Sequence, residues 1–146
     1  MIGQTIQLSL APVFVLVAIG NILNILSTRL GRIVDRARIL QRLHNETQGD
    51  EHDRVVIEIR VVDSRIGIIT GAIRLMVIAA LAIGTTVALL FVDGIFGFDL
   101  HVPAAVTFLG SILLLLTGLV LFLRETQIAA ASLRIPSDFL ELHREI

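Results

Sequence analysis

The chain contains three long apolar stretches, and nearly all of its charged residues lie in two blocks, one after the first stretch and one after the third. The first charge in the chain is Arg29, and residues 75–92 and 102–123 carry no charge. About 20 helical residues cross a hydrocarbon core of about 30 Å, because each residue adds about 1.5 Å. The pattern therefore predicts three transmembrane helices, over residues 6–28, 66–92 and 102–123.

Between the first two spans, apolar residues recur at alternating steps of three and four. One series is Leu26, Leu30, Ile33, Ala37 and Leu40; the other is Val55, Ile59, Val62, Ile66, Ile69, Ile73 and Met76. This heptad spacing is typical of helices that pack along an apolar seam. We expect the first two helices to continue past the membrane as an antiparallel coiled-coil hairpin over residues 29–65. Its turn is expected at residues 44–50, where Gly49 and Asn45 suit the end of one helix and Asp50 can cap the next.

The composition supports one membrane domain over residues 1–146. Hydrophobic residues make up 55% of only 146 residues, more than a soluble chain of this size can bury in one core. The predicted fold class is therefore an all-α membrane protein. There is no cysteine, which excludes disulfides, thiolate nucleophiles and sulfur-ligated metals.

The positions of the arginines predict the orientation. All 12 basic residues are arginines; eight lie between the first two spans, three follow the third, and residues 93–101 have none. Short loops rich in Lys and Arg stay on the cytoplasmic side. We expect an N-terminus outside, with the hairpin and the C-terminal tail, residues 124–146, in the cytoplasm.

Polar residues form a stripe on the first helix: Gly20, Asn24, Ser27, Thr28, Gly31 and Asp35, with Asn21 adjoining. In the predicted hairpin, Arg74 lies level with Asn21 and Asn24. An arginine at the edge of the hydrocarbon normally faces a polar partner or reaches the headgroups. We therefore expect either a polar intramembrane cluster (Asn21, Asn24, Thr28, Thr70 and Arg74) or an Arg74 that reaches lipid phosphate by itself.

Four arginines just outside the first span are expected to contact anionic headgroups; they are Arg29, Arg32, Arg36 and Arg38. Interspersed acids such as Asp35, Glu58 and Asp63 interrupt any uniform basic face, so nucleic acid is not implied. The hairpin tip holds His44, Glu46, Asp50, Glu51, His52 and Asp53. These side chains suit either a divalent-cation site or a solvated turn, and the absence of metal-ligand spacing favours the turn.

The remaining polar residues do not predict catalysis. Ser9, Ser27 and Ser111 have no histidine near them in sequence, and His101 beside Asp99 is expected to mark an interfacial turn. Pro12 can kink the first span. After Pro136, residues 137–146 place Phe139, Leu142 and Ile146 on one helical face, which suits the membrane surface or the hairpin. We expect no catalytic residue, no metal and no cofactor.

Several segments resemble one known family. They are residues 11–14, Asn24, the run Thr-Arg-Leu-Gly-Arg-Ile-Val-Asp-Arg-Ala-Arg at 28–38, and residues 121–125 and 132–134. In these the chain is similar to the bacterial inner-membrane proteins catalogued as domain of unknown function 2721. The resemblance covers essentially the whole chain and implies three membrane spans. It implies no activity, since none is assigned to that family.

Together these features favour a non-enzymatic membrane protein. We expect a homo-oligomeric assembly or scaffold protein, or an accessory subunit of a larger membrane complex, that docks through its hairpin. The alternative is a small oligomeric channel or transport component in which the polar stripe lines the pathway. The expected partners are the bilayer with its anionic lipids and either further copies of the chain or a larger complex.

Overall fold

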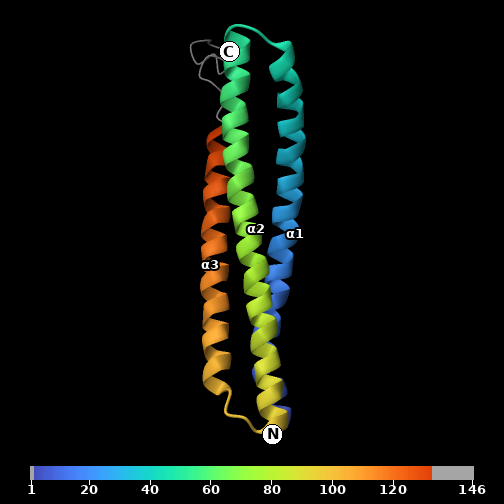
Figure 1. Ribbon diagram of the computed structural model, residues 1–146, viewed down its shortest axis with the longest axis vertical. Helices are drawn as coiled ribbons and strands as arrows, with labels where there is room; N and C mark the ends of the chain where they lie inside the picture. Colours follow the sequence, from blue (N-terminus) through green and yellow to red (C-terminus); the bar gives the residue numbers. More distant parts are fainter. Residues whose placement is uncertain (1, 133–146) are drawn as a thin grey trace, which may run out of the picture.

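The computed structural model describes residues 2–132 and is all-helical over that range. It contains α1 (Ile2–Glu46), α2 (Asp50–Phe96) and α3 (His101–Ser132), which run side by side along the long axis of the molecule (Figure 1). All three are long and apolar enough to cross a membrane. The predicted all-α class with three long apolar helices is confirmed. The expectations for residues 133–146, including Phe139, Leu142 and Ile146, lie outside the described residues.

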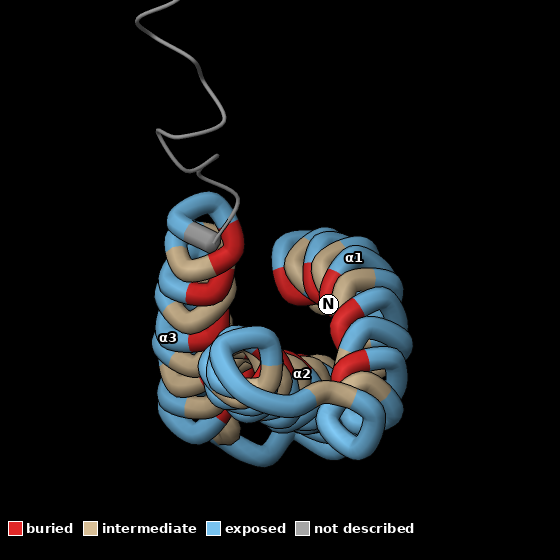
Figure 2. Tube along the Cα trace, turned by 90° about the horizontal axis from the view of Figure 1, so that it is seen from above, coloured by how far each residue is buried: buried red, intermediate tan, exposed pale blue. Residues whose placement is uncertain are grey.

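The central helix of the bundle is α2, which packs against both other helices, whereas α1 and α3 have little contact with each other. Seen along the bundle, α1 and α3 lie on different sides of α2 (Figure 2). The end with the α1–α2 turn is called the hairpin end, and the end with the α2–α3 connection is called the loop end. Because α3 is the shortest helix, the outer part of the hairpin extends past it (Figure 1).

The turn of the hairpin lies at Gly49, as predicted, but the residue in the cap position of α2 is not the predicted one. Helix α1 ends at Glu46, and the Thr47 amide and hydroxyl both donate to the Leu43 carbonyl, at 3.0 and 2.8 Å. Gly49 has φ of 67°, a backbone conformation that glycine adopts without strain. The prediction that Asp50 caps α2 is wrong: Asp50 is already helical, and Gly49 occupies the cap position without a side-chain hydrogen bond.

At the loop end, Asp93 organises the connection between α2 and α3. Gly97 has φ of 68°, and its amide donates to the Asp93 carbonyl at 2.9 Å, which ends α2. The Asp93 carboxylate accepts a hydrogen bond from the Leu100 amide at 3.1 Å. Pro103 lies in the first turn of α3, where its missing N–H leaves no hydrogen bond unmade.

The predicted apolar seam is buried between α1 and α2. The buried positions recur every seven residues, as Ile19, Leu26, Ile33 and Leu40 on α1 and as Val55, Val62, Ile69, Met76 and Ile83 on α2. Toward the hairpin end, the core cluster draws its residues from α1 and α2 alone, with Leu30, Ala37, Ile59 and Ile66 packed around it. The heptad pattern therefore predicted this interface correctly.

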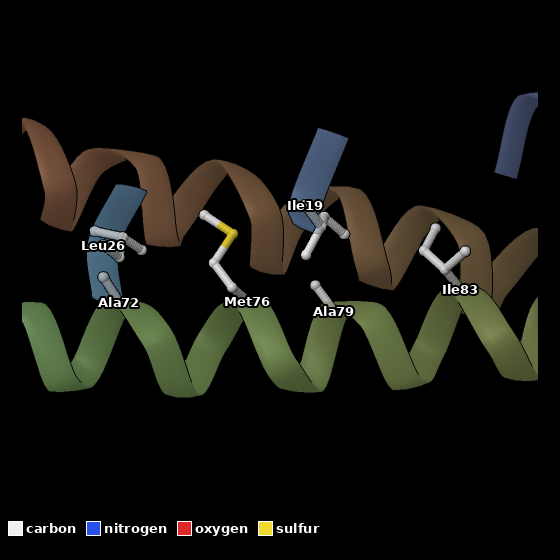
Figure 3. Packing of buried hydrophobic residues seen from close by; sticks show 6 residues of the cluster. All are labelled: Ile19, Leu26, Ala72, Met76, Ala79 and Ile83. Carbon is white, nitrogen blue, oxygen red and sulfur yellow. The ribbon is translucent and has the colours of Figure 1, made fainter. Parts of the chain in front are cut away.

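Toward the loop end, the core includes all three helices. Ile19 and Leu26 of α1 meet Ala72, Met76, Ala79 and Ile83 of α2 (Figure 3). Partly buried side chains from α3, such as Phe108 and Leu115, pack against this cluster. Small residues on α2 and α3 let the helix backbones approach closely, as is common in membrane bundles. A hydrogen bond between the Thr86 and Thr107 hydroxyls, 2.9 Å long, joins α2 to α3 in this region.

Gly118 is one such point of close approach, and it provides the first test of the packing. A Cβ built there would lie 2.8 Å from the Met76 terminal methyl and 3.6 Å from the Ala72 carbonyl oxygen. We expect Gly118→Val to lower the free energy of unfolding in detergent by about 1–3 kcal/mol, because the branched side chain would have to displace the Met76 methyl within the buried core. Gly110→Val is the matched control, since nothing lies within 4 Å of a Cβ at Gly110. Equal effects of the two substitutions would contradict this packing.

Candidate functional site

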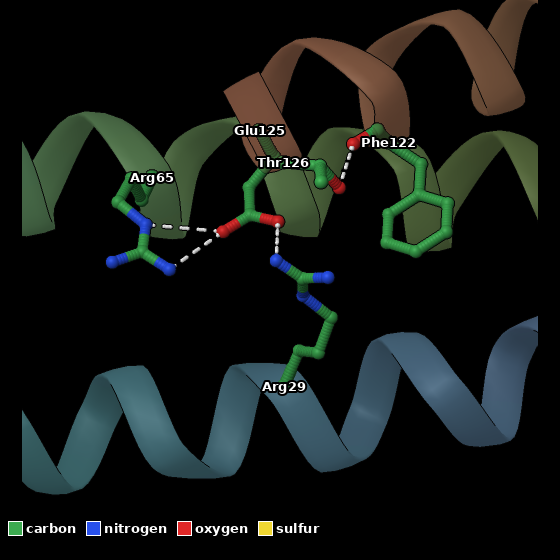
Figure 4. Close-up of polar contacts among 5 residues, drawn as sticks. All are labelled: Arg29, Arg65, Phe122, Glu125 and Thr126. Atoms are coloured by element: carbon green, nitrogen blue, oxygen red, sulfur yellow. Dashed lines mark hydrogen bonds and ion pairs between the residues drawn. The ribbon is translucent and has the colours of Figure 1, made fainter. Parts of the chain in front are cut away.

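One buried carboxylate connects the three helices. Glu125 of α3 is fully buried and lies between Arg65 of α2 and Arg29 of α1 (Figure 4). Arg65 donates two hydrogen bonds to Glu125 Oε1, from Nε at 3.0 Å and from Nη2 at 2.8 Å. Because two N–H groups donate to one oxygen, the orientation of the guanidinium is fixed more closely than by a single hydrogen bond. Arg29, Arg65 and Glu125 are called the triad below.

Arg29 binds the other oxygen of the same carboxylate. Its Nη2 lies 2.8 Å from Glu125 Oε2. The geometry is that of an ion pair rather than of a hydrogen bond, and Oε2 accepts no hydrogen bond from the described residues. The Arg29 guanidinium also lies over the Phe122 ring, 5.2 Å from its centroid, which adds a cation–π contact to α3. Arg29 therefore holds α1 against α3, two helices that otherwise have little contact.

The triad lies at one edge of the apolar belt. Glu125 follows the charge-free residues 102–123 of α3 by two positions, and Arg29 is the first charge on α1. The charge-free part of α3 is about 33 Å long, which matches a hydrocarbon core of about 30 Å. If that stretch spans the core, the triad lies just beyond it, at the depth of the lipid headgroups.

The charges of the triad suit a contact that holds the three helices together. A buried carboxylate costs several kcal/mol unless it is paired and hydrogen-bonded. Here two guanidiniums compensate one carboxylate, and the Arg29 and Arg65 side chains are 30% and 19% exposed, so water still reaches both. The triad has a net charge of +1, which suits the anionic surface of a membrane. It contains no nucleophile and no free base, so it supports positioning rather than catalysis.

The predicted lipid-contacting arginines divide into two groups. Arg29 belongs to the triad, and Arg36 binds Glu58 of α2 through Nε at 2.7 Å and Nη2 at 2.6 Å. Arg38 lies 3.7 Å from Asp35, and Arg32 is exposed. Headgroup contact by these residues stays a prediction. For Arg29 and Arg36, the first partner is a carboxylate of the chain itself.

Within one chain, the residues of the predicted polar cluster do not meet. Asn21, Asn24, Thr28, Thr70 and Arg74 are all exposed. The Thr28 hydroxyl donates to the Asn24 backbone carbonyl at 2.9 Å, which is a contact within α1. Among residues 2–132, no hydrogen bond or ion pair joins Arg74 to any of the others. The cluster stays a prediction, and a single copy of the chain does not form it.

The titratable residues at the two ends of the bundle form pairs. At the loop end, His101 Nε2 lies 3.6 Å from Asp93 Oδ2, so the carboxylate beside His101 is that of Asp93 rather than that of the neighbouring Asp99. A cavity of about 680 Å³ opens beside this pair, with Thr5, Gly94 and Phe98 in its wall.

At the hairpin tip, the His44 and His52 rings lie 4.5 Å apart. Within the described part of the chain, no group of three or more acidic or histidine side chains could hold a metal ion.

The interpretation of the sequence missed the triad, although a signal was present. Contacts across the hairpin join residues whose numbers add to about 95, as in Arg36–Glu58 and His44–His52. Arg29 and Arg65 satisfy the same rule, so they lie at one depth. Glu125 is the acid closest to the end of the third apolar stretch. Two arginines and one acid at one membrane edge could have suggested the junction.

The comparisons with known proteins find one family. A family model described as Protein of unknown function (DUF2721) matches residues 9–135. No curated protein and no solved structure matches the chain. The matched range includes most of the first apolar stretch, all of the other two, the hairpin and all three residues of the triad. The chain therefore belongs to the DUF2721 family.

Proposed function

We propose that this chain is a multi-pass protein of the bacterial inner membrane that associates with copies of itself. In this role it is an assembly or scaffold protein, or an accessory subunit of a larger membrane complex. Its N-terminus lies outside, and its hairpin and C-terminal tail lie in the cytoplasm. The hairpin is a coiled-coil stalk that docks partners.

One observation carries the proposal: among residues 2–132, the polar stripe of α1 makes no hydrogen bond or ion pair to α2 or α3, and its contacts stay within α1. Gly20, Asn24, Ser27, Thr28, Gly31 and Asp35 are all exposed, whereas the seam that contacts α2 is buried. Polar side chains in a membrane normally face a protein partner, because lipid offers them no hydrogen bonds. A second copy of the chain supplies such a partner, and the small residues of the stripe allow close approach.

The hairpin supports the docking part of the proposal. Its seam holds α1 and α2 together without α3, which suits a self-supporting stalk. Outside the apolar belt, Ile39 and Ile57 remain 45% and 62% exposed among charged neighbours. Large apolar side chains outside lipid suit contact with another protein surface. The arginines around the triad support a cytoplasmic location for the stalk, since positive residues are retained on that side.

The exposed stripe also favours a second candidate, a small oligomeric channel or transport component. In this alternative, Asn24, Thr28 and Gly31 of several copies would surround a common pathway. Three helices per chain can line a pathway only as an assembly, so both candidates require self-association. They differ in whether the stripe lies dry against a neighbour or faces water.

Native mass spectrometry after mild detergent extraction tests the proposal. We expect a discrete complex of two or more copies, either alone or with a larger assembly. Four or more copies would make a central pathway geometrically possible, and conductance of Asn24→Leu and wild-type complexes would then compare the two candidates. A chain that is monomeric and free of partners, in detergent and in lipid nanodiscs, would exclude both.

A further inference from the structure

Two rows of exposed residues on the outer faces of α1 and α2 have the same spacing. On α1 the row is Phe14, Asn21, Thr28 and Asp35, and on α2 it is Arg60, Gly67, Arg74 and Leu81. Each row repeats every seven residues, so each follows one side of its helix. All eight positions are exposed, and neither row takes part in the packing between the helices of one chain.

The two rows also have matching depths along the bundle. Residues that face each other across the hairpin have numbers that add to between 94 and 99, as in Arg36–Glu58, His44–His52 and Thr5–Gly94. The numbers in the two rows add to 95 when they are paired as Phe14 with Leu81, Asn21 with Arg74, Thr28 with Gly67 and Asp35 with Arg60. Each α1 residue therefore lies level with one α2 residue.

At every level the paired residues suit each other chemically. Asp35 and Arg60 carry opposite charges outside the apolar belt, and among residues 2–132 the ion-pair contact of Asp35 is the 3.7 Å one with Arg38. Gly67 has no atom within 4 Å of a built Cβ, which leaves room for the branched Thr28 side chain. Phe14 and Leu81, the deepest pair, are apolar and are 70% and 68% exposed.

The remaining pair concerns the arginine near the membrane interior. Arg74 lies about 13 Å deeper along α2 than Arg65, at about 1.5 Å per residue. It has no hydrogen bond or ion pair among the described residues. The Asn21 side-chain oxygen can accept a hydrogen bond from a guanidinium, and no acid lies at this depth on any of the three helices. A neighbouring copy would bring this amide to Arg74.

We propose that the α1 row of one copy packs on the α2 row of a second copy. Rotation about an axis along the membrane normal leaves every residue at its own depth, so the matched levels are kept between copies. Because the two surfaces differ, the contact repeats head to tail and closes into a ring where the rotation permits. The inference rests on the proposed self-association and specifies the surface that produces it.

Cross-linking between two differently tagged copies tests the register. The chain has no native cysteine, so each pair of introduced cysteines gives an unambiguous product. Thr28→Cys is combined with Gly67→Cys on the other copy, and Phe14→Cys with Leu81→Cys. The mismatched control combines Thr28→Cys with Leu81→Cys. Each of these positions also belongs to a matched pair, but the two lie at levels about 21 Å apart. In oxidised membranes we expect at least about tenfold more disulfide from the matched pairs, because a disulfide requires Cα atoms within about 7 Å.

A charge exchange provides an independent readout on the intact complex. Asp35→Arg and Arg60→Asp should each reduce the oligomer population in native mass spectra, and the double variant should restore it. A stable oligomer with equal matched and mismatched cross-linking, or with no rescue, would overturn this surface and leave self-association standing. A wild-type chain that is monomeric would overturn both.

Discussion

Replacing Glu125 with leucine is expected to lower the free energy of unfolding by about 3 kcal/mol, the lower end of the range for breaking a buried ion pair. The loss arises because Arg29 and Arg65 would face each other without the carboxylate that compensates them. The lower end applies because both arginines are partly exposed and water screens their repulsion. Unfolding by SDS titration in mixed micelles measures the change.

Two further variants separate the triad from a general effect of lost charge. Glu58→Leu removes the carboxylate of the exposed pair with Arg36, and its expected effect is below about 1 kcal/mol. Arg29→Leu, Arg65→Leu and Glu125→Leu combined should recover most of the stability, because an apolar junction of similar volume needs no compensation. The role of the triad is contradicted if Glu125→Leu and Glu58→Leu behave alike.

Leu40→Ala is expected to destabilise the hairpin end by about 2–5 kcal/mol, since it opens a cavity in a packed seam. Leu40 is 1% exposed and belongs to the cluster that α1 and α2 form without α3. No other helix in residues 2–132 can compensate for the loss there. We expect faster proteolysis within residues 36–60 and faster amide hydrogen exchange in the same segment, with little change around Met76.

The adjacent residue supplies the matched control. Ile39 is 45% exposed, so Ile39→Ala should change the free energy of unfolding by no more than about 0.5 kcal/mol in a single copy. Both variants introduce an alanine, and the two positions are adjacent in α1. If the hairpin is equally protected from proteolysis and from hydrogen exchange in the two variants, a packed seam through Leu40 is contradicted.

The spacing of apolar residues predicted which residues of α1 and α2 pack together, because that packing depends on which residues share one face of a helix. The seam from Leu26 to Leu40, and the turn at Gly49, follow from local periodicity and from one glycine. Heptad spacing places a residue on a face, and a short turn forces the two faces together. The Asp50 cap failed because glycine already supplied the conformation that begins α2.

The site depends on how α3 packs, which local patterns do not specify. Glu125 meets both arginines because α3 contacts α2 through Gly118 and small α2 residues, a match of shapes rather than of hydrophobic period. The proposed meeting of Arg74 with Asn21 rested on equal depth alone. Depth along a helix does not specify direction around it, and the structure turns both residues to the outside of the single chain.

The triad and the two exposed rows give the chain a consistent arrangement in the membrane. The triad fixes α3 to the hairpin where the helices leave the apolar belt. We propose that the rows on α1 and α2 contact neighbouring copies.

Residue-specific labelling in intact cells tests the arrangement of the three helices across the membrane most directly. Gln48→Cys marks the hairpin tip and Phe98→Cys marks the loop end, and both native side chains are exposed. With a membrane-impermeant maleimide, we expect Phe98→Cys to react in intact cells and Gln48→Cys to react only in inverted vesicles. Reaction of both from the same side, or of Gln48→Cys from outside, would contradict three spans with a cytoplasmic hairpin.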